Sequence, residues 1–484
     1  MKQIETDYLI IGSGAVGLAF ADTLLDETDA HITLVDRHAK PGGHWNDAYS
    51  FVTLHQPSAF YGVNSLSLGS NRKDTHGVNT GLYELASGPE VSGYFDKVMH
   101  QKLLSSGRVS YYPMSNYDGH EGGKGVFTSI LSGVQTQVAV RKKTMDGTMF
   151  TTAVPSTRPP KYRVAPGVRL VPPNALAQLW MGAGGGAAAP ERPERFVIAG
   201  AGKTAMDVGV FLQRLGVPPE SIHWVMPRDS WLVNRLTTQP GPEFFVHSIG
   251  GQALQFEALA AATDIDDAFL RLEASGQMLR IFPDRKPTMF HYATISAGEV
   301  EVLARIKNVI RMGRVRGIDA EGLLLDGGRV AMPANTLYID CTASAVEMRD
   351  IAPGPIFQDK KIILQLVRAP LVTFSAALVA YVEAHYPDDA TKNRLCRPVP
   401  FPENLLGFAK STLGNMMNQF QWSQDKPLRQ WIRGTRLDGF GKLVADASAD
   451  DADKQAILIR LKNSSIAAMG NITRLLAADS QPAR

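Results

Sequence analysis

Two clusters of small residues have the types and spacing that bind a dinucleotide. Each directly follows an apolar run and opens an apolar stretch, so each predicts a strand, a tight turn and a helix. Such a turn presents free backbone N–H groups and the positive end of a helix dipole to a pyrophosphate. The first cluster reads G-x-G-x-x-G, and in the second alanine takes the third place, where a small residue suffices. They are Gly12, Gly14 and Gly17, and Gly200, Gly202 and Ala205.

Charged residues beyond each cluster predict which nucleotide it binds. Asp36 stands about 20 residues after the first cluster, the spacing of a carboxylate that binds the adenosine ribose. Arg37 follows it. In the second unit Arg228 is the first charged residue after the second strand, and a guanidinium there favours the 2′-phosphate of NADP. Asp229 follows at once and weakens that preference.

The second turn adds two polar candidates for phosphate binding. They are Lys203 and Thr204. For the lysine, a solvated side chain is an equally good interpretation, because a Lys side chain at the start of a helix often extends into water.

Two βαβ units position these residues. The first has a predicted strand at Tyr8–Ile11, a helix at Val16–Leu25 and a strand at His31–Val35, and the second unit runs over Phe196–Met226. Strands that alternate with helices form a parallel sheet. We therefore predict an α/β protein with two Rossmann-like dinucleotide-binding domains. The stretch Gly182–Pro190 has no preceding strand and is predicted to be a surface loop.

The residues that follow Asp36 carry a resemblance to a known family. Gly42, Gly43 and Trp45 match the G-G-x-W segment that follows the acidic ribose residue in the flavin-containing monooxygenases. The resemblance implies that the first unit holds FAD, with Gly43, His44 and Trp45 near it. It also implies that the second unit takes up NADPH. The expected activity is a monooxygenase in which a flavin C4a-hydroperoxide, formed with O2, oxygenates a small organic molecule.

The segment Leu54–Pro57 is similar to the one that runs beneath the flavin in that family. Its sequence resembles the L-H-x-P version, whereas many relatives carry an asparagine near this point that hydrogen-bonds the peroxide. No asparagine stands here. His55 and Gln56 are therefore the candidate catalytic residues, and simple packing of the loop is the alternative for either one.

The resemblance also implies a discontinuous FAD domain. Its first part would be residues 1–170, the inserted NADPH domain residues 171–334, and its second part residues 335–484 with a helical C-terminal tail.

Two features of the second part of the FAD domain, residues 335–484, are expected to complete the flavin site. Tyr338–Ala343 resembles the strand that returns the chain to the flavin domain, with Asp340 and Thr342 near the cofactor edge. Pro370 and Leu371 are expected to open a helix. Proline is favoured in a first turn, and such a helix end stabilises the reduced flavin.

The cysteines and one missing motif limit what the chain can do. Cys341 and Cys396 lack the C-x-x-C or C-x4-C spacing of the flavoprotein disulfide reductases, so that class is excluded. A flavin-dependent halogenase and an NAD(P)H oxidase or redox flavoprotein without oxygen transfer stay open. The family's F-x-G-x-x-x-H motif is not found, and Pro173 and Asn174 stand where its Phe and His are sought.

The overall composition is that of a globular protein. A net charge of +3 over 484 residues gives no reason to expect a nucleic-acid partner. The apolar region from Ile362 contains Arg368 and Pro370, so a strand, a turn and a helix are predicted rather than a membrane span. We expect no metal site and a cytoplasmic location, and neither the substrate nor the oligomeric state can be predicted.

Overall fold

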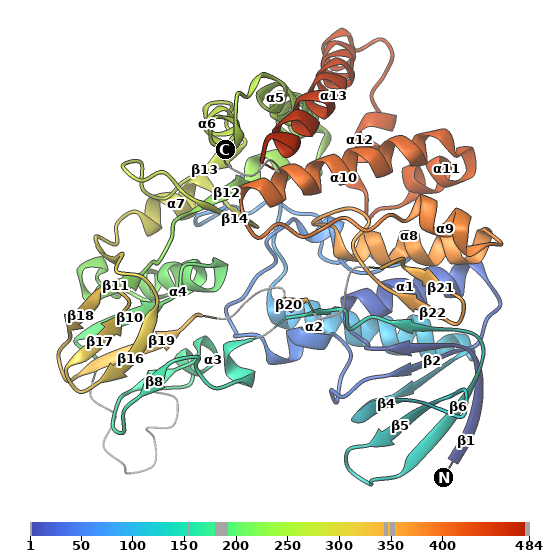
Figure 1. Ribbon diagram of the computed structural model, residues 1–484, viewed down its shortest axis with the longest axis horizontal. Helices are drawn as coiled ribbons and strands as arrows, with labels where there is room; N and C mark the ends of the chain where they lie inside the picture. The colour runs from blue at the N-terminus through green and yellow to red at the C-terminus, as the bar shows by residue number, and fades with distance from the viewer. Residues whose placement is uncertain (1, 153, 180–191, 343–346, 349–353, 480–484) are drawn as a thin grey trace.

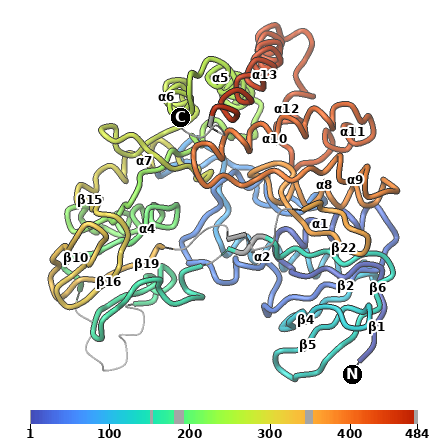
Figure 2. The backbone as a smooth tube through the Cα atoms, viewed as in Figure 1, coloured from blue at the N-terminus to red at the C-terminus, as the bar shows by residue number. Residues whose placement is uncertain are grey.

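Two parallel sheets and a helical region make up the computed structural model. It describes residues 2–152, 154–179, 192–342, 347–348 and 354–479, so Gly182–Pro190 and Ala343 lie outside the described residues. The sheets lie side by side, and the helical region spans both along one side (Figures 1 and 2).

The first sheet contains the first glycine cluster. Its strands run in the order β21-β22-β6-β1-β2-β3, and β22, β6, β1, β2 and β3 are mutually parallel. An antiparallel excursion, β4 and β5, leads into β6. The strands are β1 (Lys2–Ile11), β2 (Ile32–Val35), β3 (Val109–Tyr112), β4 (Ser115–Glu121), β5 (Lys124–Ser129), β6 (Gln135–Asp146), β21 (Phe357–Gln358) and β22 (Lys361–Ile363). The helices of this unit are α1 (Ala15–Glu27), α2 (Gly88–Lys97), α8 (Val372–His385) and α9 (Asp389–Leu395).

The second sheet contains the second glycine cluster. Its order is β15-β11-β10-β19-β9, with all neighbours parallel. As in the first unit, antiparallel strands precede the last central strand, but here they belong to a separate sheet in the order β18-β17-β16-β8. The strands of the second unit are β8 (Arg163–Val164), β9 (Leu170–Val171), β10 (Arg195–Ala199), β11 (Ile222–Val225), β15 (Asn308–Ile310), β16 (Val315–Asp319), β17 (Gly322–Leu325), β18 (Gly328–Ala331) and β19 (Thr336–Asp340). The helices are α3 (Pro173–Leu176), α4 (Lys203–Arg214) and α7 (Ala297–Leu303).

The helical region is built from two separate parts of the chain. A middle segment supplies β12 (Ser230–Asn234), α5 (Phe245–Ala261), α6 (Ile265–Ala274), β13 (Met278–Leu279) and β14 (Met289–Ile295). The C-terminal tail supplies α10 (Leu405–Gln424), α11 (Lys426–Gly434), α12 (Gly439–Ala445) and α13 (Ala452–Asp479). A shared apolar core that includes Trp231, Phe269, Phe290 and Phe408 joins the two parts. In Figure 1 the red α13 lies along the green α5.

The predicted α/β fold with two Rossmann-like units is confirmed, and so is the strand, turn and helix from Ile362. One expectation about a strand is wrong. The strand at Tyr338 pairs with β10 and β9 of the second sheet, and the chain returns to the first sheet at β21 and β22. Among the described residues, no helix is long and apolar enough to cross a membrane.

Candidate functional site

The first glycine turn leaves the N-terminus of α1 open. Gly12 has φ +95°, a conformation that favours glycine, and a Cβ on Gly17 would lie 1.9 Å from the Gly12 carbonyl oxygen. Gly14 is the N-cap of α1 and provides no side-chain cap. The first N–H groups of the helix therefore keep no side-chain partner at the cap, which suits them to a phosphate.

The Gly42–Trp45 segment packs directly against this turn. A Cβ on Gly43 would lie 2.9 Å from the Gly14 Cα, so Gly43 needs to be glycine at this approach. The Gly42 N–H donates to the Ser13 carbonyl at 2.8 Å, and the Trp45 indole donates to the Tyr61 hydroxyl at 2.8 Å. The structure thus brings together the two predicted flavin segments as one cradle.

Two aromatic side chains of the cradle lie side by side. His44 and Trp45 stack with ring centroids 5.3 Å apart. Burial lowers the pKa of His44 to about 4, so its imidazole is neutral at physiological pH.

Asp36 lies at the end of β2, beside the first turn. One carboxylate oxygen, Oδ2, accepts from the Ser13 N–H at 2.5 Å and from the Ser13 hydroxyl at 3.0 Å. The other, Oδ1, accepts from the His38 N–H at 2.7 Å and lies 2.9 Å from the His38 Nδ1. Burial opposes the charge of Asp36, but the bonds from His38 and Ser13 outweigh it and hold its pKa below the ordinary value. Arg37 is exposed.

The second glycine turn repeats this geometry. Gly200 has φ +124°, and a Cβ there would lie 2.6 Å from the Cys341 carbonyl oxygen. Gly202 caps α4 without a side-chain bond, and no heavy atom lies within 4 Å of the place a Cβ would occupy. Ala205 is fully buried, as its packing role requires. A ligand can therefore approach the backbone at Gly202.

Lys203 is not a solvated side chain, so that interpretation needs correction, and its ion pairs argue against a phosphate contact. Its Nζ is buried in ion pairs with Asp207 and, at 3.2 Å, with Glu299. Both carboxylates are largely buried, so the charge of the ammonium is compensated inside the protein. Thr204, the second residue of α4, contacts the Tyr49 hydroxyl.

Arg228 stands alone at the end of β11. It is exposed and has no ion pair within 4 Å among the described residues. Asp229 accepts two bonds from Arg311, at 3.0 and 2.9 Å. This pairing neutralises the one acid that weakened the prediction for a 2′-phosphate.

His55 and Gln56 lie in the loop between the cradle and α2. The His55 backbone carbonyl lies 3.4 Å from the Nε of Arg235, and the Gln56 amide donates to the Phe60 carbonyl at 3.2 Å. Burial, assisted by the nearby Lys203, lowers the pKa of His55 to about 4. The His55 ring is therefore neutral, and a role for either side chain toward a flavin stays a prediction.

A buried charge cluster between the two units escaped the sequence analysis. Its members are Lys203, Asp207, Arg235 and Glu299, with Tyr49 bonded to it. Arg235 is fully buried and also donates to Asn79, at 2.5 Å, and to the Thr294 carbonyl, at 3.1 Å. One sequence signal was available, because Ser296-x-x-Glu299 has the pattern of a capping box.

A repeated Asp-x-Thr turn beside each glycine cluster was also missed. Asp340 Oδ1 accepts from the N–H and the hydroxyl of Thr342, at 3.0 and 2.6 Å, and Asp146 Oδ1 accepts from Thr148 in the same way, at 2.9 and 2.6 Å. Since β19 belongs to the second sheet, Asp340 and Thr342 lie beside the second turn and not beside the first. The recurrence of D-x-T at the ends of two strands, β6 and β19, was the sequence signal for it.

Pro370 precedes its helix and is not part of it, which corrects the predicted helix start. The helix α8 begins at Val372 with Leu371 as its N-cap, and the Leu371 N–H donates to the Arg368 carbonyl at 2.8 Å. Since β22 runs parallel to β1, α8 starts at the same sheet edge as α1, and its buried face packs on α1. Asn415 holds the preceding peptide through the N–H and the carbonyl of Ala369, at 2.9 and 2.8 Å.

The C-terminal tail reaches the loop that carries His55. Arg436 donates to the carbonyls of Val63, Ala59 and Tyr61 at 2.9, 2.7 and 2.6 Å. A Cβ on Gly439 would lie 1.8 Å from the Phe60 ring. The tail therefore sets the course of the chain directly after His55 and Gln56.

The region where the F-x-G-x-x-x-H motif was sought also contacts the cradle. The Asn174 amide donates to the Asp47 carbonyl at 2.8 Å, and its Oδ1 is buried without a partner in the described structure. Pro173 is the buried first residue of α3.

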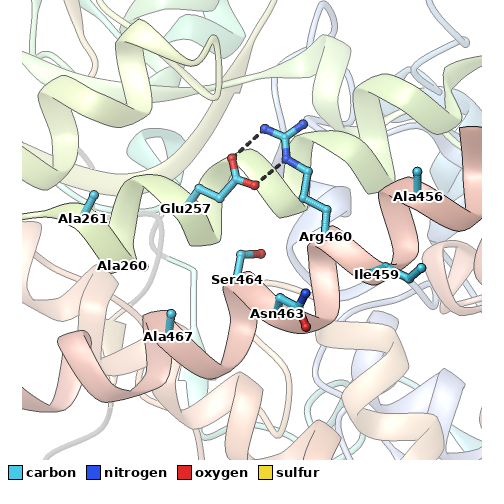
Figure 3. A pocket seen from close by; sticks show the side chains of 9 residues that line it. All are labelled: Glu257, Ala260, Ala261, Ala456, Ile459, Arg460, Asn463, Ser464 and Ala467. Carbon is cyan, nitrogen blue, oxygen red and sulfur yellow. Dashed lines mark hydrogen bonds and ion pairs between the residues drawn. The ribbon is translucent and has the colours of Figure 1, made fainter.

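A surface hollow of about 590 Å³ lies elsewhere, between α5 and α13 (Figure 3). Small residues such as Ala260 and Ala467 line it, and the Glu257 and Arg460 ion pair bridges its helices. It contains none of the predicted site residues.

Both cysteines are buried and unbridged, and burial raises the pKa of each thiol well above its ordinary value. Neither thiol is therefore suited to redox exchange.

The comparisons with known proteins fit this geometry. Residues 10–72 match the model of an NAD(P)-binding Rossmann-like domain. Fold and turns together define an α/β protein of the class with two Rossmann-like dinucleotide-binding units. The chain belongs to one family with uncharacterized proteins of Mycobacterium tuberculosis and Mycobacterium bovis. Each is 43% identical over 477 residues, which cover 99% of this chain and 86% of the relative.

Among solved structures, the chain is similar to three monooxygenases. A flavin-containing monooxygenase from Stenotrophomonas maltophilia matches at 12% identity and a TM-score of 0.45, over 79% of this chain and 98% of that one. An open form of cyclohexanone monooxygenase matches at 13% identity and a TM-score of 0.45, over 98% of each chain. A steroid monooxygenase bound to NADP matches at 10% identity and a TM-score of 0.46, over 79% and 85%.

Proposed function

We propose that the chain is an FAD-dependent monooxygenase that NADPH reduces and that oxygenates a small organic molecule. The proposal rests on a difference between the two glycine turns, neither of which has a side-chain cap. Both suit a pyrophosphate, but only the first is backed by a second glycine segment, at Gly43 and Trp45. Two different dinucleotides explain two different turns.

FAD fits the first unit. The α1 N-terminus would hold its pyrophosphate, and the Asp36 carboxylate would accept from the adenosine ribose. The close approach of Gly43 to Gly14 packs the Gly42–Trp45 segment against the turn that would bind the pyrophosphate. The start of α8 would present a positive dipole end to the flavin ring, which favours its reduced anionic form.

NADPH fits the second unit. The open backbone at Gly202 would receive its pyrophosphate, and the unpaired guanidinium of Arg228 would bind the 2′-phosphate. A pool of NADPH and two unbridged cysteines agree with a cytoplasmic location.

Bound flavin would supply the electron transfer from NADPH to O2 and the transfer of one oxygen atom to the substrate. The chain's residues would prepare the site for it. Arg235 fixes the His55 carbonyl, Arg436 fixes the next turn of the chain, and the neutral His55 imidazole retains both a hydrogen-bond donor and an acceptor. A hydrogen-bonding group held in a water-excluding site limits loss of reactive oxygen as hydrogen peroxide.

Spectroscopy and product analysis test the proposal together. Purified protein should be yellow and should release FAD on denaturation, and NADPH should bleach it without oxygen. With labelled O2 and a panel of ketones, sulfides and amines, one labelled oxygen atom should appear in product. Colourless protein that gains no flavin on reconstitution would overturn the proposal. Halogenated product with added bromide, or stoichiometric peroxide with every substrate, would reassign the flavoprotein as a halogenase or an oxidase.

A further inference from the structure

The Asp36 carboxylate has no acceptor position left for a ribose. A carboxylate offers about four lone-pair sites, and four donor atoms already lie against this one. Two are backbone N–H groups, of Ser13 and His38, and two are side-chain groups, the Ser13 hydroxyl and the His38 Nδ1.

We propose that His38 occupies the adenosine-ribose site of the protein without FAD, and that its imidazole must leave Asp36 when FAD binds. This inference rests on the proposed binding of FAD in the first unit. The two backbone donors are fixed by the glycine turn and by the end of β2. Only the two side-chain donors can move, and two is also the number of neighbouring hydroxyls that a ribose presents. His38 is thus a positioning residue that keeps a buried carboxylate paired until the ligand arrives.

A second carboxylate holds the other side of the ring. The His38 Nε2 lies 3.0 Å from the Asp47 carboxylate, and Asp47 belongs to the same segment as Gly43 and Trp45. With an acid at each nitrogen, both nitrogens donate, and the ring is an imidazolium. The hydrogen bond to Asp36, supported by Asp47, outweighs the effect of burial and raises the pKa of His38.

The other titratable groups around His38 keep their charge near neutral pH. His44 is neutral because burial lowers its pKa to about 4. Tyr111, whose hydroxyl lies 3.3 Å from that of Ser13, stays protonated because burial raises its pKa to about 12. Asp36 stays ionised, and Arg37 carries a permanent charge. His38 is therefore the group near the ribose site whose charge changes as the pH rises through its raised pKa.

The sign of the pH dependence follows from this geometry. Below the raised pKa of His38, FAD must displace a charge-assisted bond, which is about twice as strong as a neutral one. Above that pKa the ring is neutral, and one of its two carboxylate bonds is lost. FAD affinity should therefore rise about tenfold as the pH increases through the pKa of His38. FAD binding below that pKa should release a proton.

Calorimetric titration of the flavin-free protein with FAD, from pH 5.5 to 8.5, measures both effects. Buffers of different ionisation enthalpy give the number of protons released. His38→Ala and His38→Gln should bind FAD with an affinity nearly independent of pH and without proton release, and the alanine variant should bind more tightly at pH 6. The glutamine variant keeps a neutral hydrogen-bond donor for Asp36. It therefore controls for a folding defect that the alanine variant could cause. His31→Ala, at the exposed start of β2, is the matched control and should keep the wild-type profile.

The outcomes separate this inference from the proposed function. FAD binding with a flat pH profile in the wild-type protein, or with the same slope in both His38 variants, would overturn the role of His38 and leave the flavoprotein intact. Failure of wild-type and His31→Ala proteins to bind FAD at any pH would overturn both.

Discussion

The Tyr49 hydroxyl donates a hydrogen bond of 2.7 Å to the carboxylate of Asp207, across the boundary between the two dinucleotide units. Tyr49 follows the cradle of the first unit, and Asp207 lies in the first turns of α4. Two residues further on, the Phe51 ring stacks on Phe211 of α4 with centroids 3.9 Å apart. The relative position of the two units is therefore set by polar and apolar contacts from the same short segment.

Tyr49→Phe should loosen this boundary without affecting FAD. Removal of the hydroxyl takes one partner from a buried carboxylate, which costs about 1–3 kcal/mol of unfolding free energy. Urea unfolding measures that loss, and stopped-flow reduction by NADPH should be slower at unchanged FAD content. Tyr83→Phe removes an exposed hydroxyl bonded to Glu243 and should change neither quantity. Equal reduction rates in all three proteins would argue against a role of the boundary in hydride transfer.

Lys203→Met should destabilise the protein and not act through the nucleotide. The substitution leaves Asp207 and Glu299 with one buried cation in place of two, and loss of one member of a buried ion pair costs about 3–5 kcal/mol. Thermal and urea unfolding measure the loss. The contrary result would be a protein of normal stability with selectively weakened NADPH binding, as expected of a phosphate ligand.

Stability should fall in acid through Glu299. Burial opposes its charge, but Lys203 and Arg235 lower its pKa from 4.5 to about 2. A carboxyl whose pKa is lower in the folded protein stabilises it above the unfolded-state value, so this contribution is complete above pH 4.5 and is lost toward pH 2. It amounts to about 3 kcal/mol.

Urea unfolding at several pH values between 2.5 and 5 checks this. Glu299→Gln should remove much of the slope, whereas Asp319→Asn, in an exposed pair with Arg329, should remove little. The same slope in wild-type and Glu299→Gln proteins would contradict the assignment.

Arg228→Ala should reduce the preference for NADPH over NADH. A charged hydrogen bond to the 2′-phosphate contributes about 1–3 kcal/mol, or about ten- to a hundredfold in affinity. Stopped-flow measurement of flavin bleaching with NADPH and with NADH gives the ratio of the two apparent affinities. Arg214→Ala, which changes an exposed arginine at the far end of α4, provides the control. If the ratio is unchanged in the Arg228 variant, another cation binds the phosphate.

His55→Ala and Gln56→Ala should keep FAD and NADPH reduction but release more hydrogen peroxide per NADPH consumed. A reactive oxygen species that loses one hydrogen bond in a dry site is destabilised by about 1–3 kcal/mol, so its lifetime should shorten about ten- to a hundredfold. Parallel assays of hydrogen peroxide and of oxygenated product measure how the consumed NADPH is divided between the two. His100 is exposed, so His100→Ala provides the control. Unchanged leakage in both variants would move the oxygen chemistry to another segment.

Residues whose role depends on local backbone geometry could be predicted from the sequence. Gly12, Gly17 and Gly200 are such cases, because Gly12 and Gly200 have positive φ angles and a Cβ on Gly17 would meet the Gly12 carbonyl of the same turn. Gly43 was predictable through its motif, although its contact with Gly14 was not.

Residues whose role depends on distant partners could not be predicted in this way. The sequence places Lys203 where a phosphate ligand would stand. Its ion pair with Glu299 forms only because α7 packs nearby, and the residues around Lys203 in the sequence do not predict that partner. Asp340 was assigned to the wrong sheet because its strand was placed by resemblance to the strand that returns the chain to the flavin domain. Only strand pairing distinguishes them.

The late return of the chain to its first sheet, at β22, has a consequence for synthesis on the ribosome. When β1 to β6 have emerged, α8 has not been made, and the apolar face of α1 that it will cover is still open. The first unit must wait for the whole second unit before its edge strand and that helix arrive, a contact pattern that slows folding. The second unit has all five of its parallel strands by Asp340 and can fold earlier. The nascent chain can therefore complete its second unit first and its first unit last, and in the interval it exposes the helix face that a chaperone could bind.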